Sequence, residues 1–172
     1  VLARLLLEHG YNVDNYVVNY SKKRTKGFLT NYDRVKKLKQ WPEMIKSSKD
    51  FPEIHKDDII VDAIFGIGLN RETSDYVNEL IQYLNENKAF KLSIDIPSGL
   101  YSNKLPIDKE HILKANYTLS FQSPKLVFFL PETAKFTEQW EVLDIGLDPK
   151  YMHEVDPKAN IIGKHNILPL YK

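Results

Sequence analysis

The chain contains two apolar segments of strand length, and each holds an aspartate close to a turn rich in glycine or proline. The first covers residues 58–65 and contains Asp62, and the second covers residues 90–96 and contains Asp95. Residues 77–87 lie between them and carry a helical apolar pattern. The two aspartates are 33 positions apart, about one strand–helix–strand unit. We therefore predict adjacent parallel strands whose carboxyl ends share one crevice.

The remaining segments also alternate between helical and strand patterns. Helices are predicted for residues 1–9 and from Asn31 to Trp41, and residues 111–115 are predicted to be the end of a short helix. Strands are predicted for residues 13–20, 117–121, 126–130 and 140–145. The strand at 58–65 is nearly all apolar, which is typical of a strand buried on both faces. We predict a doubly wound, Rossmann-like α/β domain over residues 1–150 with a mostly parallel sheet. The pattern starts at a helix without its preceding strand, so we expect the domain to be truncated at its N-terminus, and residues 151–172 to be a tail or the start of a linker.

Composition excludes several classes of function. The 172 residues are 42% hydrophobic, enough for one sizeable core, and carry a net charge of +1. Such a charge gives no field that would attract nucleic acid or a membrane, so we expect neither as a partner. The absence of cysteine excludes disulfides and thiolate chemistry. No stretch has the roughly 20 apolar residues that span a bilayer, and we expect a cytoplasmic protein.

The polar residues at the two strand ends are the best candidates for chemistry. Asp95 ends an apolar strand, where its charged form loses hydrating water. We interpret it as a general acid/base, and the alternative is a turn carboxylate bonded to the Ser98 and Gly99 amides. Asp62 and Ser98 supply oxygens that could share a cation with backbone carbonyls, or could hydrogen-bond to each other. The sequence does not separate these alternatives.

The turn after the first strand is a candidate phosphate contact. Gly66 and Gly68 would let successive backbone N–H groups form an anion-binding nest, and Asn70 and Arg71 would add donors. The third glycine of a dinucleotide fingerprint is missing, so an ordinary strand-to-helix turn with a surface arginine is an equal alternative.

Two basic positions are weaker candidates for binding. The run from Ser21 to Lys26 could bind phosphate, but we favour an ordinary basic loop. Lys125, between two predicted strands, is a weaker candidate for a substrate contact.

These motifs together resemble the NAD(P)H-hydrate epimerase family, the YjeF N-terminal domain. The resemblance extends to about Tyr151 and rests on Val1–Leu6, Asp62–Leu69, Ser93–Leu100, Ala115–Phe121 with Ser123–Lys125, and Val142–Leu147. It implies an isomerase that interconverts the R and S epimers of hydrated NADH and NADPH.

The resemblance also implies roles for single residues. Asp62 and Ser98 would be ligands of a potassium ion, the expected cofactor, and Asp95 would be the catalytic acid/base. The implied substrate-binding residues are Gly66, Ile67, Gly68, Leu69, Asn70, Arg71, Glu72 and Asp95. Asn70 stands where the family commonly has Ser or Thr. The implied partners are the small-molecule substrate and a fused or separate ADP- or ATP-dependent dehydratase, and we also allow for a homo-oligomer.

One departure from the family concerns activity. The family's Asn-Asn-Gly-Gly-Asp-Gly loop, a source of a further potassium ligand and of phosphate donors, falls immediately before Val1. We therefore expect the chain as given to be a fragment that binds weakly or is inactive.

Two rival interpretations remain. A non-catalytic binding or scaffold module, as in messenger-RNA decapping proteins that use the same fold, disagrees with the retention of Asp62, Asp95 and Ser98 and with the lack of a basic, aromatic-laced face. An unrelated Rossmann-like cofactor binder disagrees with the missing third glycine.

Overall fold

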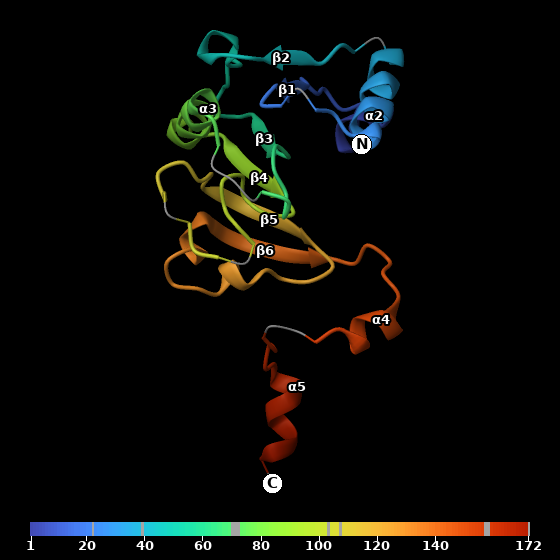
Figure 1. The fold of residues 1–172 in the computed structure, drawn as a ribbon, viewed down its shortest axis with the longest axis vertical. Coiled ribbons are helices and arrows are strands. Elements are labelled where there is room, and N and C mark those ends of the chain that lie inside the picture. The colour runs from blue at the N-terminus through green and yellow to red at the C-terminus, as the bar shows by residue number, and fades with distance from the viewer. Residues whose placement is uncertain are drawn as a thin grey trace.

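The protein is an α/β structure built around a four-stranded, all-parallel sheet (Figure 1). The computed structural model describes residues 1–21, 23–38, 40–69, 73–102, 104–106, 108–156 and 159–171. The sheet has the order β3 (Ile59–Asp62), β4 (Phe90–Ile94), β5 (Ala115–Phe121) and β6 (Thr137–Leu143), and a separate parallel pair is formed by β1 (Tyr16–Val18) and β2 (Glu43–Ile45). The predicted Rossmann-like α/β class with a parallel sheet is therefore confirmed.

Helix α3 (Asp75–Glu86) covers one face of this sheet. Its apolar stripe of Val77, Leu80, Ile81 and Leu84 is buried in a cluster that also contains side chains of β1, β2 and β3. Spacing at three and four residues places this stripe on one side of the helix. The helix predicted for residues 77–87 is confirmed.

The opposite face of β3 is open. Ile59 and Val61 are 67% and 40% exposed, whereas Asp62 is buried. Successive side chains of a strand point to opposite faces, so the two exposed residues lie on the face away from α3. The prediction that this strand is buried on both faces is wrong, because β3 is the edge strand of the four-stranded sheet and its apolar run is covered on one face only.

The two N-terminal helices were predicted with unequal accuracy. Helix α1 (Leu2–Glu8) matches the expected helix, and Gly10 follows it with φ +82°. Helix α2 (Lys26–Lys37) begins five residues before Asn31, since the Thr25 side chain accepts a hydrogen bond from the Phe28 amide and caps the helix there. It ends before Trp41, which is outside the helix.

Two predicted elements between β4 and β6 are wrong. Residues 111–115 form a bend and the start of β5 rather than a helix, and Leu126–Phe128 form a 3-10 turn, η2, rather than a strand. Val127 and Phe128 are buried in a second cluster with Phe136 of η3 (Ala134–Phe136). An apolar run of this length is buried equally well in a compact turn, so its composition did not distinguish the two. The strands predicted at 117–121 and 140–145 are confirmed as β5 and β6, with shifted ends.

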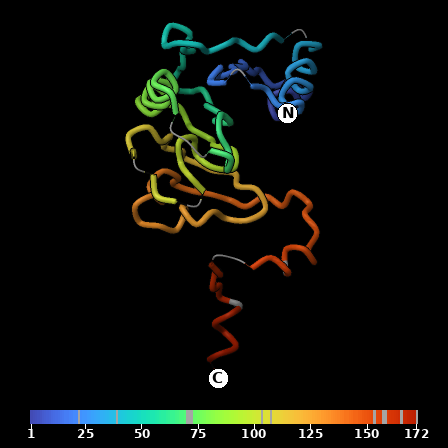
Figure 2. Tube along the Cα trace, viewed as in Figure 1, coloured from blue at the N-terminus to red at the C-terminus, as the bar shows by residue number. Residues whose placement is uncertain are grey.

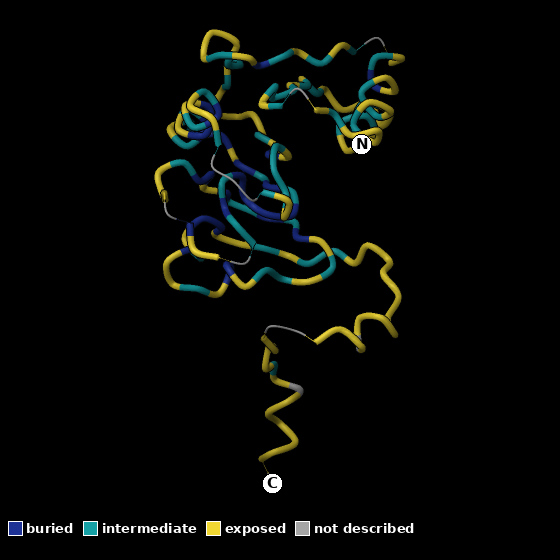
Figure 3. The backbone as a smooth tube through the Cα atoms, viewed as in Figure 1, coloured by how far each residue is buried: buried dark blue, intermediate teal, exposed yellow. Residues whose placement is uncertain are grey.

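The C-terminal segment lies away from the sheet. It contains α4 (Pro149–Glu154), α5 (Lys164–Ile167) and the 3-10 turn η4 (Leu168–Leu170). A further 3-10 turn, η1 (Ser48–Asp50), follows β2 in the N-terminal part of the chain. Figure 2 shows the trace leaving the sheet after β6, and Figure 3 shows that this segment is exposed, in contrast to the buried residues around β4. Among the described residues, none of the helices has both the length and the hydropathy of a membrane span.

Candidate functional site

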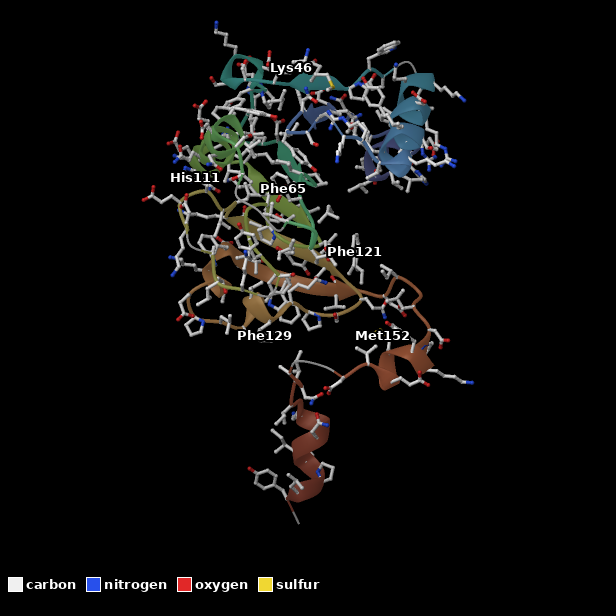
Figure 4. All side chains as sticks on the ribbon, in the orientation of Figure 1. Lys46, Phe65, His111, Phe121, Phe129 and Met152 are labelled. Atoms are coloured by element: carbon white, nitrogen blue, oxygen red, sulfur yellow. The ribbon has the colours of Figure 1, made fainter. Side chains whose placement is uncertain are left out.

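Both aspartates lie at the carboxyl edge of the sheet. Asp62 is the last residue of β3 and is paired in register with Ser93 of β4, and Asp95 follows β4 directly. Since β3 and β4 are adjacent and parallel, the two carboxylates leave the sheet on the same side. Figure 4 labels Phe65 and Phe121, whose amides bond to the polar side chains of this edge.

The Asp62 carboxylate is surrounded by hydrogen-bond donors. Its Oδ2 accepts from Ser93 Oγ at 3.0 Å and from the Ser98 amide at 2.8 Å. Its Oδ1 accepts from Ser98 Oγ at 2.6 Å and from the Ile64 amide at 3.3 Å. A carboxylate offers about four lone-pair sites, so these four donors saturate it. Asp62 therefore links the end of β3 to β4 and to the turn that follows β4.

Burial dominates the electrostatics of Asp62. The residue is 2% exposed, and burial raises the pKa of its carboxyl above the ordinary value, against the lowering effect of hydrogen bonds from Ser98, Ile64 and Ser93. No ion pair of the described residues involves Asp62. Its negative charge thus has hydrogen bonds but no cationic partner in this part of the chain.

Asp95 has a different environment. Its backbone is in the left-handed region at φ +72°, and its amide donates to the Leu119 carbonyl of β5 at 2.7 Å. Such a conformation is costly for a residue other than glycine, and it occurs mostly where function or tight packing requires it. Asp95 Oδ1 accepts from the Phe121 amide at 3.3 Å and lies 3.1 Å from Lys125 Nζ. The end of β5 therefore holds one oxygen of this carboxylate.

The alternative role for Asp95, as an acceptor from the Ser98 and Gly99 amides, does not fit this geometry. The Ser98 amide donates to Asp62 instead. The turn of Pro97–Leu100 is closed by the Leu100 amide bonding to the Pro97 carbonyl at 3.0 Å, with Gly99 at φ +90°. This turn places both the amide and the hydroxyl of Ser98 against Asp62. Of the two alternatives for Asp62 and Ser98, their mutual hydrogen bond is present, and the ion stays a prediction.

The turn after β3 lies beside Asp95. A side chain at Gly66 would place its Cβ 3.4 Å from Asp95 Oδ2, so the bare backbone at this position lies close to the second carboxylate oxygen. Neither Gly66 nor Gly68 adopts the left-handed conformation that a nest requires, and the Leu69 amide bonds back to the Gly66 carbonyl at 3.3 Å. The anion-binding nest predicted here is therefore wrong for residues 66–69. Ile67 and Gly68 are exposed, and Asn70, Arg71 and Glu72 lie outside the described residues.

Two cavities are described, and both lie elsewhere. One of about 290 Å³ is lined by α2, β1 and Val1, and one of about 490 Å³ by β1, β2 and η1. Neither includes Asp62, Asp95 or the turn at residues 66–69, so the predicted shared crevice is not among them. The described residues also contain no group of three or more His, Cys, Asp or Glu side chains that could hold a metal ion.

The amino-acid sequence of this chain matches a known protein family. Residues 1–127 match the family described as YjeF-related protein N-terminus. The chain belongs to this family. The matched range contains both carboxylates, the two turns and Lys125.

Curated relatives of this YjeF-related chain are named as epimerases and as repair enzymes. An NAD(P)H-hydrate epimerase of Weissella koreensis is 30% identical over 158 residues, which cover 91% of this chain and 69% of that protein. One of Anaerococcus prevotii is 29% identical, over 90% of this chain and 71% of that protein. A bifunctional NAD(P)H-hydrate repair enzyme Nnr of Dictyoglomus turgidum is 32% identical over 118 residues, and the match spans only 23% of its length.

Sequence reasoning missed three features of this edge. Ser93 donates to Asp62 from the neighbouring strand, and a serine inside an otherwise apolar strand, beside an aspartate in the parallel register, is the signal that could have found it. Lys125 forms an ion pair with Asp95, whereas its position in the sequence had indicated only a weak candidate for a substrate contact. Gln122, at φ +62° after β5, is a second strained residue at the same edge, and no sequence signal marks it.

Proposed function

We propose that this protein interconverts the R and S epimers of hydrated NADH and NADPH. The names of the epimerase relatives support this reaction, and so does the placement of Asp95. One observation carries the proposal: Asp95 is buried at the carboxyl edge with Oδ1 held by β5 and Oδ2 beside the bare backbone of Gly66. Among the described residues, Oδ2 has no hydrogen-bond partner and can accept a bond from a substrate, while Oδ1 is held in place.

The reaction needs a proton carrier at the carbon that bears the added hydroxyl. Protonated Asp95 gives its proton to this hydroxyl, which leaves as water, and the ring nitrogen's electron pair forms a planar iminium. A water molecule then adds from the other face, and the Asp95 carboxylate takes the proton that this water loses. The proton count balances, and the product differs from the substrate only in configuration. The fixed carboxylate also offsets the positive charge of the iminium.

A potassium ion fits the chemistry of Asp62 and Ser98. Their carboxylate and hydroxyl oxygens are hard ligands, and the buried charge of Asp62 has no cationic partner among the described residues. When bound, a monovalent cation would supply positive charge beside the substrate's phosphates. Ser98 would then turn its hydroxyl proton away from Asp62, and the Ser93 and Ser98-amide bonds would keep the carboxylate in place.

The proposal is tested on the protein at the length that its gene encodes. Hydrated NADPH enriched in the R epimer is incubated with the wild type and with Asp95→Asn, and conversion to S is followed by chromatography. We expect the variant to be about 100-fold slower or more, because a positioned acid/base contributes about 10²–10⁴ in rate. A wild type no faster than buffer would overturn the proposal in favour of a binding module, and an equally fast variant would remove Asp95 from the reaction.

Potassium binding has its own readout. If Asp62 and Ser98 hold the ion, replacing choline chloride by potassium chloride at constant ionic strength raises the melting temperature of the wild type, because a ligand that binds only the folded state stabilises it. Ser98→Ala removes one of the two ligands and should abolish this increase. An equal increase in both proteins would exclude these ligands.

A further inference from the structure

Lys125 is an unusually well-coordinated lysine. Its ammonium lies 3.1 Å from Asp95 Oδ1, and it donates to the Phe121 carbonyl at 2.9 Å and to the Ser123 carbonyl at 3.0 Å. Two of the three donors of this ammonium group are thus bonded to carbonyl oxygens, and the Asp95 carboxylate lies within ion-pair distance. The side chain is 12% exposed, as is that of Asp95. Contacts within the protein thus hold the ammonium of Lys125 beside Asp95, and the substrate contact that its sequence position suggested stays a prediction.

The bonds of Lys125 also close the loop that follows β5. Residues 121–125 are drawn into a turn whose two carbonyls face the ammonium, and the same turn brings the Phe121 amide to Asp95 Oδ1. Both contacts of Oδ1 thus originate from one loop. Both contacts restrain Oδ1, and in this orientation Oδ2 lies on the side of Gly66.

We infer that Lys125 is a positioning residue, which orients the Asp95 carboxylate for its proton transfers. The inference rests on the proposed function, since it assigns Lys125 to the same reaction. Two carbonyl acceptors hold the ammonium of Lys125 in place, and its ion pair with Oδ1 then restrains the orientation of the Asp95 carboxylate. Lys125 thus acts through Asp95 and not through contact with the substrate.

The chain offers a matched control for this lysine. Lys91, at the opposite end of β4, is 6% exposed and donates to the Asn87 and Ala89 carbonyls at 2.5 and 3.2 Å. Both lysines are buried and bonded to backbone carbonyls, but only Lys125 has a carboxylate within ion-pair distance among the described residues. A Lys→Met substitution at either position removes the same group and keeps a long apolar side chain.

The test uses Lys125→Met, Lys125→Arg, Lys91→Met, Asp95→Asn and the double variant Asp95→Asn with Lys125→Met. For Lys125→Met we expect kcat to fall about 10- to 100-fold while KM changes less than about threefold, because a misplaced catalytic group slows the reaction without removing a substrate contact. Lys125→Arg, which keeps the charge, should recover part of the loss. Lys91→Met should keep the wild-type kcat. The double variant should be no slower than Asp95→Asn alone.

Each outcome decides one claim. If the wild type shows no epimerisation, the proposed function fails, and the inference is then decided by the side-chain ¹³C carboxyl resonance of Asp95. The chemical shift of that resonance should differ from the wild type in Lys125→Met and equal the wild-type value in Lys91→Met. An unchanged chemical shift in both variants would overturn the inference. With an active wild type, an unchanged kcat in Lys125→Met, or a double variant much slower than Asp95→Asn, would also overturn it.

Discussion

Asp62 and Asp95 leave the same edge of one sheet but have opposite surroundings. Asp62 has both oxygens saturated by four donors and no ion pair among the described residues. Asp95 has one oxygen held by the end of β5 and an ion pair with Lys125. Two buried carboxylates at the same edge can therefore have different contacts. The difference lies in how many of their oxygens are already occupied.

The turn beside each carboxylate differs in the same way. Pro97–Leu100 is packed against Asp62 and tolerates no added atoms at Gly99, whereas the turn at Gly66–Leu69 is partly exposed. If Asp62 is structural and Asp95 reactive, substitutions near Asp62 should reduce stability and substitutions near Asp95 should reduce activity.

The largest effect is expected for Gly99→Ala, which disrupts the turn that holds Asp62. A Cβ there would lie 2.2 Å from the His111 carbonyl oxygen, at φ +90°. We expect the free energy of unfolding to fall by about 3 kcal/mol, because backbone strain and a clash with backbone combine. The measurement is urea denaturation.

Gly146→Ala separates these two causes. Gly146 also has positive φ, at +77°, but nothing lies within 4 Å of its Cβ position. In Gly146→Ala, backbone strain alone should lower the free energy of unfolding by about 1 kcal/mol. Equal losses for the two variants would contradict the close packing of the turn at Gly99.

A smaller effect is expected for Asp62→Asn. The amide nitrogen cannot accept bonds from the Ser98 amide or from Ser93 Oγ, so we expect a loss of about 2 kcal/mol in the free energy of unfolding. Asp57→Asn, at an exposed position, is the control and should lie within about 0.5 kcal/mol of the wild type.

The pH dependence of Asp62→Asn sharpens the comparison further. Because burial raises the pKa of Asp62 in the folded state, the folded protein binds more protons than the unfolded chain between the two pKa values. Stability contributed by the protonated carboxyl is thus present below about pH 4 and is lost as pH rises through the folded pKa. The difference in the free energy of unfolding between the wild type and Asp62→Asn, measured by urea denaturation, should therefore become smaller as the pH rises above 4. If this difference in the free energy of unfolding instead increases with pH, the folded protein stabilises the charged form of Asp62.

A smaller effect than that of Asp62→Asn is expected for Gly66→Ala. Its Cβ would lie 3.4 Å from Asp95 Oδ2, an ordinary contact, so folding should be unaffected. The methyl group would occupy space next to the free oxygen, and we expect about a 10-fold loss of kcat/KM, which corresponds to about 1.4 kcal/mol. Gly27→Ala, in α2 with nothing within 4 Å, should leave kcat/KM unchanged. An unaltered kcat/KM in Gly66→Ala would show that substrate does not approach from this side.

Local pattern was sufficient for much of the fold. The helices at α1 and α3 and the strands β3 to β6 follow from apolar periodicity, which depends on neighbouring residues alone. The pattern was not sufficient where a single capping side chain decided the boundary, as at Thr25, or where a short apolar run could be buried as a strand or a turn, as at Leu126–Phe128.

The sequence by itself determined that Asp62 and Asp95 would stand at one edge of a parallel sheet, because one strand–helix–strand unit separates them and parallel strands end on the same side. The tertiary structure decided what each carboxylate contacts. Ser98 reaches Asp62 from 36 positions away, and the Phe121 amide reaches Asp95 from 26 positions away. These contacts depend on how separate turns close against each other, and periodicity within a strand or helix carries no information about that closure.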